Sequence, residues 1–98
     1  MQTLTTTIRK EPFEAIVAGT KTIEYREIKE YWEKRLAQYK APFLLRLING
    51  MKKDAPELTV EVVKVKRDSR HGVFELHLGK VVEVKNYKAA TKAARSKK

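Results

Sequence analysis

Residues 42–66 have the sequence PFLLRLINGMKKDAPELTVEVVKVK, and this stretch decides the class of fold that we predict. Within it, residues 43–48 are an apolar run interrupted only by Arg46, and residues 58–66 alternate between apolar and polar side chains. An Asn-Gly pair opens the polar loop between the two runs. Alternation with a period of two is typical of strands, so the stretch predicts a β-hairpin with a long loop.

Further strands and helices are expected on both sides of this hairpin. The patterning predicts two short helices, one from about Pro12 to a stop at Gly19 and one over residues 29–38. It also predicts strands at residues 3–8, 22–28, 73–78 and 81–84, the last two separated by Gly79. The order β-α-β-α-β-β-β-β predicts an α+β fold. We expect a small, mostly antiparallel β-barrel of five or six strands, with two short helices early in the chain.

Composition limits the classes of protein that the chain can belong to. Its 98 residues suffice for one domain, and 42% hydrophobic residues favour folding over disorder. The lack of cysteine excludes disulfides and thiolate metal sites, and the two histidines are too few to suggest a zinc or haem site. No apolar run approaches the roughly 20 residues that span a bilayer, and no signal peptide is evident. We therefore expect a cytoplasmic protein, favoured as a monomer, with no metal, cofactor or membrane partner.

The net charge of +10 predicts a polyanionic partner, most simply nucleic acid. Residues 86–98 hold five basic side chains and no acidic one, whereas residues 1–85 hold 17 basic and 12 acidic side chains. We therefore predict a folded domain over residues 1–85 and a basic, flexible tail over residues 86–98. The tail is either a solubilising segment or an arm that contacts phosphates.

The densest cluster of functional candidates lies in residues 19–26, GTKTIEYR. Gly19 forms a turn that leads into the strand predicted at residues 22–28. Glu24 and Arg26 are two residues apart on one face of that strand. Lys21 stands at the start of the strand, where its long side chain reaches over the same edge.

Two arrangements of this strand are consistent with its periodicity. In one, Ile23 and Tyr25 form the core face and the charged side chains are solvated. In the other, Glu24 and Arg26 face inward, where leaving them unpaired would cost several kcal/mol. They would then need each other, Lys21, or a water-filled cleft.

The octet fits the pattern G-x-K-x-x-E-x-R and resembles the signature of the ASCH domain, a relative of the PUA-like RNA-binding barrels. The surrounding sequence is similar too, with KEPFEAIVAG before the octet and EIKEYWEKRL after it, and the resemblance extends from about residue 3 to residue 84. It implies a barrel with a cleft lined by Lys21, Glu24 and Arg26, presented by Gly19 and roofed by the next helix. The implied ligand is an RNA or a modified nucleoside.

The resemblance leaves open whether the cleft binds or hydrolyses its ligand. Some ASCH relatives remove the acetyl group of N4-acetylcytidine. They are similar to this chain at Lys21 but have threonine where it has Glu24, and a carboxylate cannot replace a hydroxyl nucleophile in kind. Other relatives are ribonucleases. In a hydrolase, Lys21 would be the general base, with Glu24 orienting it or activating water.

A binding role places fewer chemical requirements on the same residues. Lys21 would contact a phosphate or a base edge as a cation, and Glu24 would accept a hydrogen bond from a cytosine or guanine amino group. Arg26 would fix Glu24 or contact phosphate. Tyr31 is a candidate stacking surface for a base, and Arg46 either lines the cleft or points to solvent. We interpret Trp32 as more typical of a core anchor.

Overall fold

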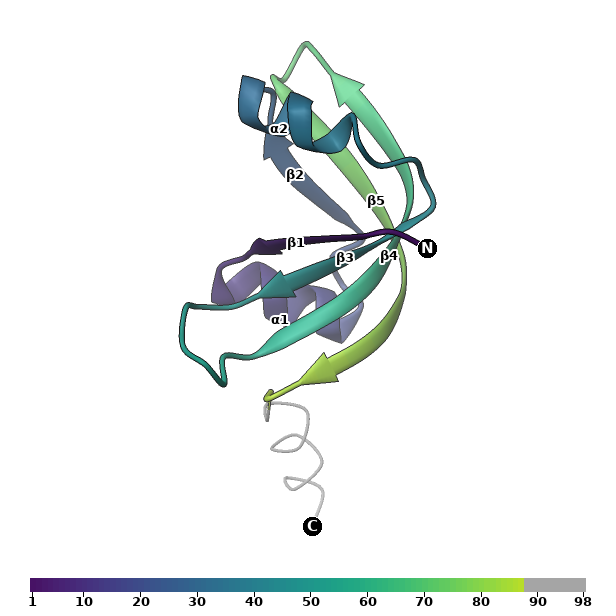
Figure 1. Ribbon diagram of the computed structural model, residues 1–98. Coiled ribbons are helices and arrows are strands. Elements are labelled where there is room, and N and C mark those ends of the chain that lie inside the picture. Colours follow the sequence, from purple (N-terminus) through teal and green to yellow (C-terminus); the bar gives the residue numbers. More distant parts are fainter. Residues whose placement is uncertain (88–98) are drawn as a thin grey trace.

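The computed structural model describes residues 1–87 and has an α+β fold with two helices and one five-stranded sheet (Figure 1). In chain order the elements are β1 (Thr3–Thr7), α1 (Lys10–Ala18), β2 (Ile23–Glu27), α2 (Glu30–Leu36), β3 (Phe43–Ile48), β4 (Glu57–Asp68) and β5 (Val73–Lys85). The tail predicted at residues 86–98 lies outside the described residues from residue 88 onward. Tyr87 packs edge-on against Phe13 of α1, with ring centroids 5.1 Å apart, so the packed domain reaches at least to Tyr87.

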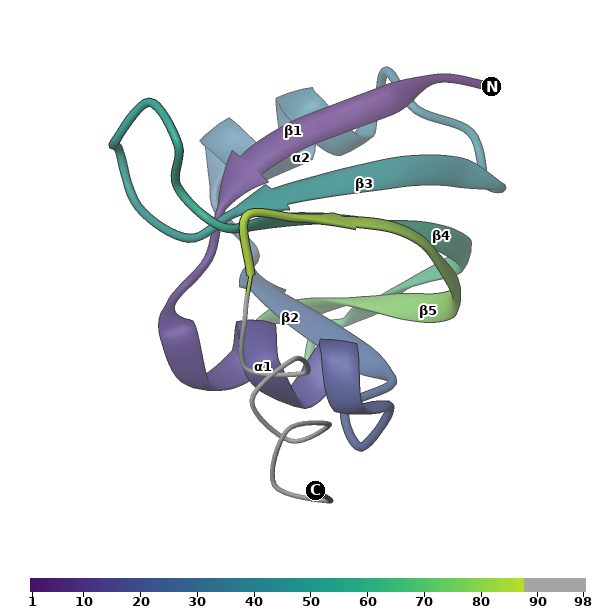
Figure 2. The same ribbon diagram turned by 90° about the horizontal axis from the view of Figure 1, so that it is seen from below.

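The sheet has the strand order β1-β3-β4-β5-β2 and curls into a half-barrel. Three of its four pairings are antiparallel, and β1 and β3 are parallel. Parallel neighbours need a long crossover, and the segment α1-β2-α2 supplies it. Figure 2 shows β1 and β2 as the outermost strands of the row. The sheet is therefore mixed, with two edge strands. Its five strands and three antiparallel pairings are compatible with the small, mostly antiparallel barrel that the sequence predicted, but the parallel pairing of β1 with β3 was not predicted.

The hydrophobic core fills the inner face of the curled sheet. Alternate residues of β3 and β4 point inward and are fully or almost fully buried, among them Leu45, Leu47 and Val60. Phe13 of α1 and Leu36 of α2 pack against them, so both helices cover this face. Removing such apolar surface from water stabilises the fold by roughly 25 cal/mol per Å².

Gly79 lies inside β5 and does not divide it, so the prediction of two separate strands at residues 73–78 and 81–84 was wrong. A Cβ atom at Gly79 would lie 2.9 Å from Cγ1 of Val63 and 3.2 Å from Oε1 of Glu61. Beside it, the pairing of β4 with β5 shifts register twice between Val60 and Lys64. Glycine is therefore required here because β4 and β5 approach closely at an irregular point of the ladder.

Gly19 ends α1, as the sequence predicted. It has φ +83°, and its N–H donates to the carbonyl oxygen of Ile16 at 3.1 Å. The N–H groups of Thr20 and Lys21 both donate to the carbonyl oxygen of Ala15. This cap turns the chain directly into β2, and it places Lys21 next to the first residues of that strand.

Candidate functional site

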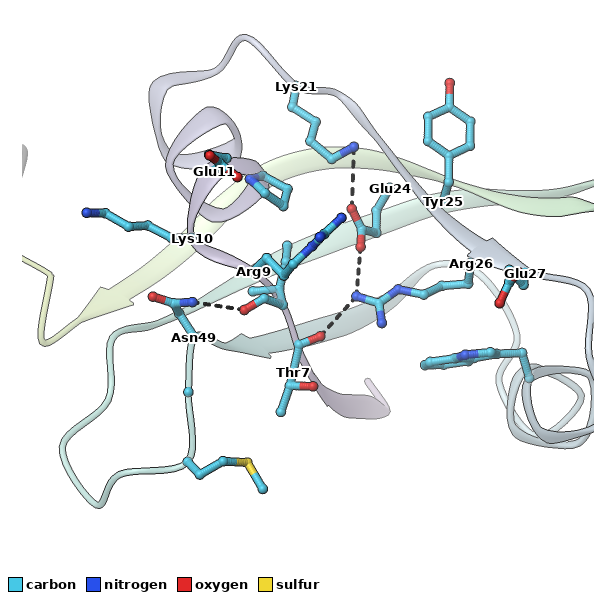
Figure 3. Close-up of a pocket in the computed structure, with 15 residues that line it drawn as sticks. Thr7, Arg9, Lys10, Glu11, Lys21, Glu24, Tyr25, Arg26, Glu27 and Asn49 are labelled. Carbon is cyan, nitrogen blue, oxygen red and sulfur yellow. Dashed lines mark hydrogen bonds and ion pairs between the residues drawn. The ribbon is translucent and has the colours of Figure 1, made fainter.

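A cleft of about 1080 Å³ lies where the end of β1, the start of α1 and the strand β2 meet the loop after β3 (Figure 3). Its volume lies just above the roughly 300–1,000 Å³ that is usual for small-molecule sites. Fifteen residues line it: Thr7, Ile8, Arg9, Lys10, Glu11, Pro12, Lys21, Glu24, Tyr25, Arg26, Glu27, Trp32, Asn49, Gly50 and Met51. Lys21, Glu24 and Arg26 of the octet are all among them.

Glu24 is the buried centre of a three-residue charge cluster. Its Oε1 lies 3.4 Å from Nζ of Lys21, and its Oε2 accepts a hydrogen bond of 2.7 Å from Nη2 of Arg26. The Glu24 side chain is only 8% exposed, while those of Lys21 and Arg26 are 22% and 17% exposed. The arrangement in which Ile23 and Tyr25 face the core is therefore wrong. Two cations compensate the buried carboxylate, and the cluster keeps one net positive charge toward the cleft.

Arg26 is held from three sides. Its Nη2 also donates to the carbonyl oxygen of Thr7 in β1 at 3.1 Å, and its guanidinium carbon lies 5.2 Å from the ring centre of Trp32. Trp32 packs against the hydrophobic core and also lines the cleft, so it is a core anchor and a cleft residue at once. These contacts preorganise the guanidinium.

An exposed aromatic ring stands beside the charge cluster. Tyr25 is 51% exposed, and Figure 3 shows its ring pointing away from Arg26. Nζ of Lys21 lies 5.2 Å from the centre of that ring. Lys21 therefore contacts both the buried carboxylate of Glu24 and the outward-facing ring of Tyr25.

Sequence reasoning missed the wall of the cleft opposite β2. The amide of Asn49 donates to the carbonyl oxygen of Ile8 at 3.0 Å, which fastens the loop after β3 to the end of β1. Figure 3 shows the side chain of Arg9 extending into the cleft and that of Lys10 pointing away from it. Only the parallel pairing of β1 with β3 brings these segments together, and no local pattern signals that pairing.

Three other candidates from the sequence do not line this cleft. Gly19 caps α1. Tyr31 accepts a hydrogen bond of 3.0 Å from Nη1 of Arg35 and is exposed on α2. Arg46 lies on the outer face of β3 and forms a two-point ion pair with Glu57, at 2.6 and 3.0 Å. The hydrogen bond between them raises the pKa of Arg46 and lowers that of Glu57.

The charge of the cleft lining is mixed, with four basic side chains and three acidic ones. Such a lining suits a ligand that has both anionic groups and hydrogen-bond donors. Within residues 1–87, no group of three or more His, Cys, Asp or Glu side chains could hold a metal ion. No helix in this part of the chain is long and apolar enough to cross a membrane.

No protein-family model matches the sequence, and no curated protein matches it.

Proposed function

We propose that the chain is an RNA-interacting protein of the ASCH type, with a PUA-like fold, that binds a nucleotide or a short single-stranded RNA in the cleft. The observation that carries the proposal is the buried carboxylate of Glu24, fixed between Lys21 and Arg26 at the wall of the cleft. Residues of the G-x-K-x-x-E-x-R pattern thus share one cleft wall. The curled five-stranded sheet is compatible with a small barrel-like fold.

The cluster offers complementary contacts to a nucleotide. Lys21 and the free N–H groups of a preorganised Arg26 suit phosphate oxygens, and the carboxylate of Glu24 suits an amino group of cytosine or guanine. Trp32 and Tyr25 provide aromatic surface next to these groups. Single-stranded RNA is recognised by this combination of cations, edge contacts and stacking.

A hydrolase is the second candidate, because Lys21 and Glu24, the two residues that it would use, lie 3.4 Å apart in the cleft. A general base needs the neutral amine, whereas the ion pair with Glu24 needs the ammonium ion. The contact therefore suits binding better than proton abstraction by Lys21. Hydrolysis of RNA or of N4-acetylcytidine that disappears in Lys21→Met would nevertheless establish the enzyme and replace the binding proposal.

The binding proposal is tested by fluorescence anisotropy with a labelled single-stranded RNA of about 4 nucleotides, a length within known single-strand site sizes. Lys21→Met removes one charge from the cleft. Lys34→Met removes one charge from the exposed surface of α2, where Lys34 pairs with Glu30. We expect about tenfold weaker binding for Lys21→Met and less than about twofold for Lys34→Met. Equal effects of the two variants would overturn the proposal.

A further inference from the structure

The outer face of the sheet carries two rows of side chains, and of their members only Tyr25 also lines the cleft. Tyr25 of β2 is opposite Glu75 of β5, which is opposite Lys66 of β4. Directly opposed residues of antiparallel strands point to the same face. The row Tyr25, Glu75, Lys66 therefore runs across three strands on the side away from the core, over two strand spacings or roughly 10 Å.

A second row lies beside the first, with Ile23, His77 and Lys64 in register. The intervening residues Leu76 and Phe74 are buried, so both rows belong to the outer face. Nε2 of His77 lies 3.0 Å from Oε1 of Glu75. The carboxylate of Glu75 therefore has a hydrogen-bond partner on the same strand.

The lysines of these rows are available to an anion. Lys64 and Lys66 are exposed, and within residues 1–87 neither forms an ion pair. Beyond Lys66, a shallow depression of about 380 Å³ extends over the turn between β4 and β5. Two arginines of that turn, Arg67 and Arg70, also line the depression. Asp68 and Glu75 line it too, so this end of the row carries three basic side chains and two acidic ones.

Lys21 joins this face to the cleft. Its Nζ contacts Glu24 on the cleft side and lies over the ring of Tyr25, the first member of the outer row. A sheet face with an exposed aromatic ring and cations two strands away is a surface on which single-stranded RNA can stack a base and place its phosphates.

We propose that the outer face of β2, β5 and β4 binds the continuation of the RNA strand that occupies the cleft. One base stacks on Tyr25 as the strand leaves the cleft past Lys21. The following phosphates contact Lys64 and Lys66. This inference rests on the proposed function, because it extends the same ligand beyond the cleft. The charge of the two exposed lysines and the continuity through Lys21 carry it.

The test compares single-stranded RNAs of about 4 and about 12 nucleotides, both within known single-strand site sizes. The double variant Lys64→Gln/Lys66→Gln removes the two charges of the outer face. The charge-matched control is Lys34→Gln/Lys80→Gln, two exposed lysines outside the cleft and both rows. We expect the outer-face variant to bind the short RNA as the wild type does and the long RNA about tenfold more weakly. The affinity of the control variant should fall by less than about threefold for either RNA.

Equal affinity of the outer-face variant and the control for the long RNA would overturn this inference. The affinity of Lys21→Met for the short RNA distinguishes failure of this inference from failure of the proposed function. If Lys21→Met binds the short RNA more weakly than the wild type, while the two double variants have equal affinity for the long RNA, only the outer-face path is wrong. If Lys21→Met binds the short RNA as the wild type does, the cleft proposal fails, and the outer-face path fails with it.

Discussion

Nη2 of Arg26 in β2 donates to the carbonyl oxygen of Thr7 in β1 at 3.1 Å, although these strands form opposite edges of the sheet. Two further carbonyl groups of β1 accept side-chain hydrogen bonds. Nη2 of Arg35 donates to the carbonyl oxygen of Thr5 at 3.1 Å, and the hydroxyl of Tyr39 donates to the carbonyl oxygen of Thr3 at 3.4 Å. Side chains thus satisfy three carbonyl groups along the free edge of β1, which makes these groups less available for pairing with another chain.

Replacing Arg26 with lysine should destabilise the protein although the charge is kept. Nη2 donates to both Glu24 and Thr7 while the planar guanidinium lies over the ring of Trp32, and a lysine ammonium group cannot reproduce that planar contact together with both hydrogen bonds. We expect the free energy of unfolding to fall by about 1–2 kcal/mol in urea titrations. The control is Arg67→Lys, whose pair with Glu33 is half-exposed; it should cost less than about 1 kcal/mol. A larger loss in the control would contradict the special role of Arg26.

Glu24→Ala should be more damaging than the loss of an exposed carboxylate on the same strand. It removes the buried group between Lys21 and Arg26 and leaves two neighbouring cations without compensation. We expect a loss of about 2–3 kcal/mol in the free energy of unfolding. Glu27→Ala is the matched control, because Glu27 is 70% exposed and pairs with the exposed Lys29; its effect should stay within about 0.5 kcal/mol. Similar losses in both variants would argue against the buried cluster.

Much of the fold follows from local patterns in the sequence. The alternation of residues 58–66 and the apolar run of residues 43–48 locate β4 and β3, and Gly19 marks the end of α1. The parallel pairing of β1 with β3 was not predicted, because it joins segments about 40 residues apart and leaves no local signal. Gly79 was interpreted as a break because sequence alone does not distinguish a turn glycine from one required by close strand contact.

The candidate site was also predictable only in part, because local patterns do not show how distant segments pack together. Alternation places Glu24 and Arg26 on one strand face, but it does not say which face is buried. That choice is made by Leu76 and Phe74, which stand opposite Glu24 and Arg26 in β5 and belong to the core. Arg46 was ambiguous because a charged residue in an apolar strand can face a cleft or solvent. Its position is settled by Glu57 on the neighbouring strand.

Gly79→Ala tests the close approach of β4 and β5. The new methyl group would lie 2.9 Å from Cγ1 of Val63, a β-branched side chain with little rotameric freedom. We expect a loss of about 1–3 kcal/mol in the free energy of unfolding, typical of overpacking. In the Val63→Ala background the same change should cost clearly less, because the clashing atom is gone. A double-mutant cycle measures this coupling, and equal costs in both backgrounds would refute it.

The ion pair between Glu57 and Arg46 should contribute to the pH dependence of stability. The hydrogen bond from Arg46 lowers the pKa of Glu57 in the folded protein. A lowered folded-state pKa stabilises the protein above the unfolded value of about 4.3. That contribution is lost as the pH falls through the folded-state pKa, when the carboxylate is protonated. In urea titrations between about pH 7 and pH 3, Glu57→Gln should therefore lose stability less steeply on the acid side than the wild type.

Arg46→Met provides the control for this pH dependence. It leaves the carboxylate of Glu57 in place but removes the hydrogen bond that lowers its pKa. The free energy of unfolding should therefore fall less steeply toward acid pH in Arg46→Met, as it does in Glu57→Gln. The double variant should not flatten further, because either single change already abolishes the pair. An unchanged slope in Arg46→Met would mean that another partner sets the pKa of Glu57.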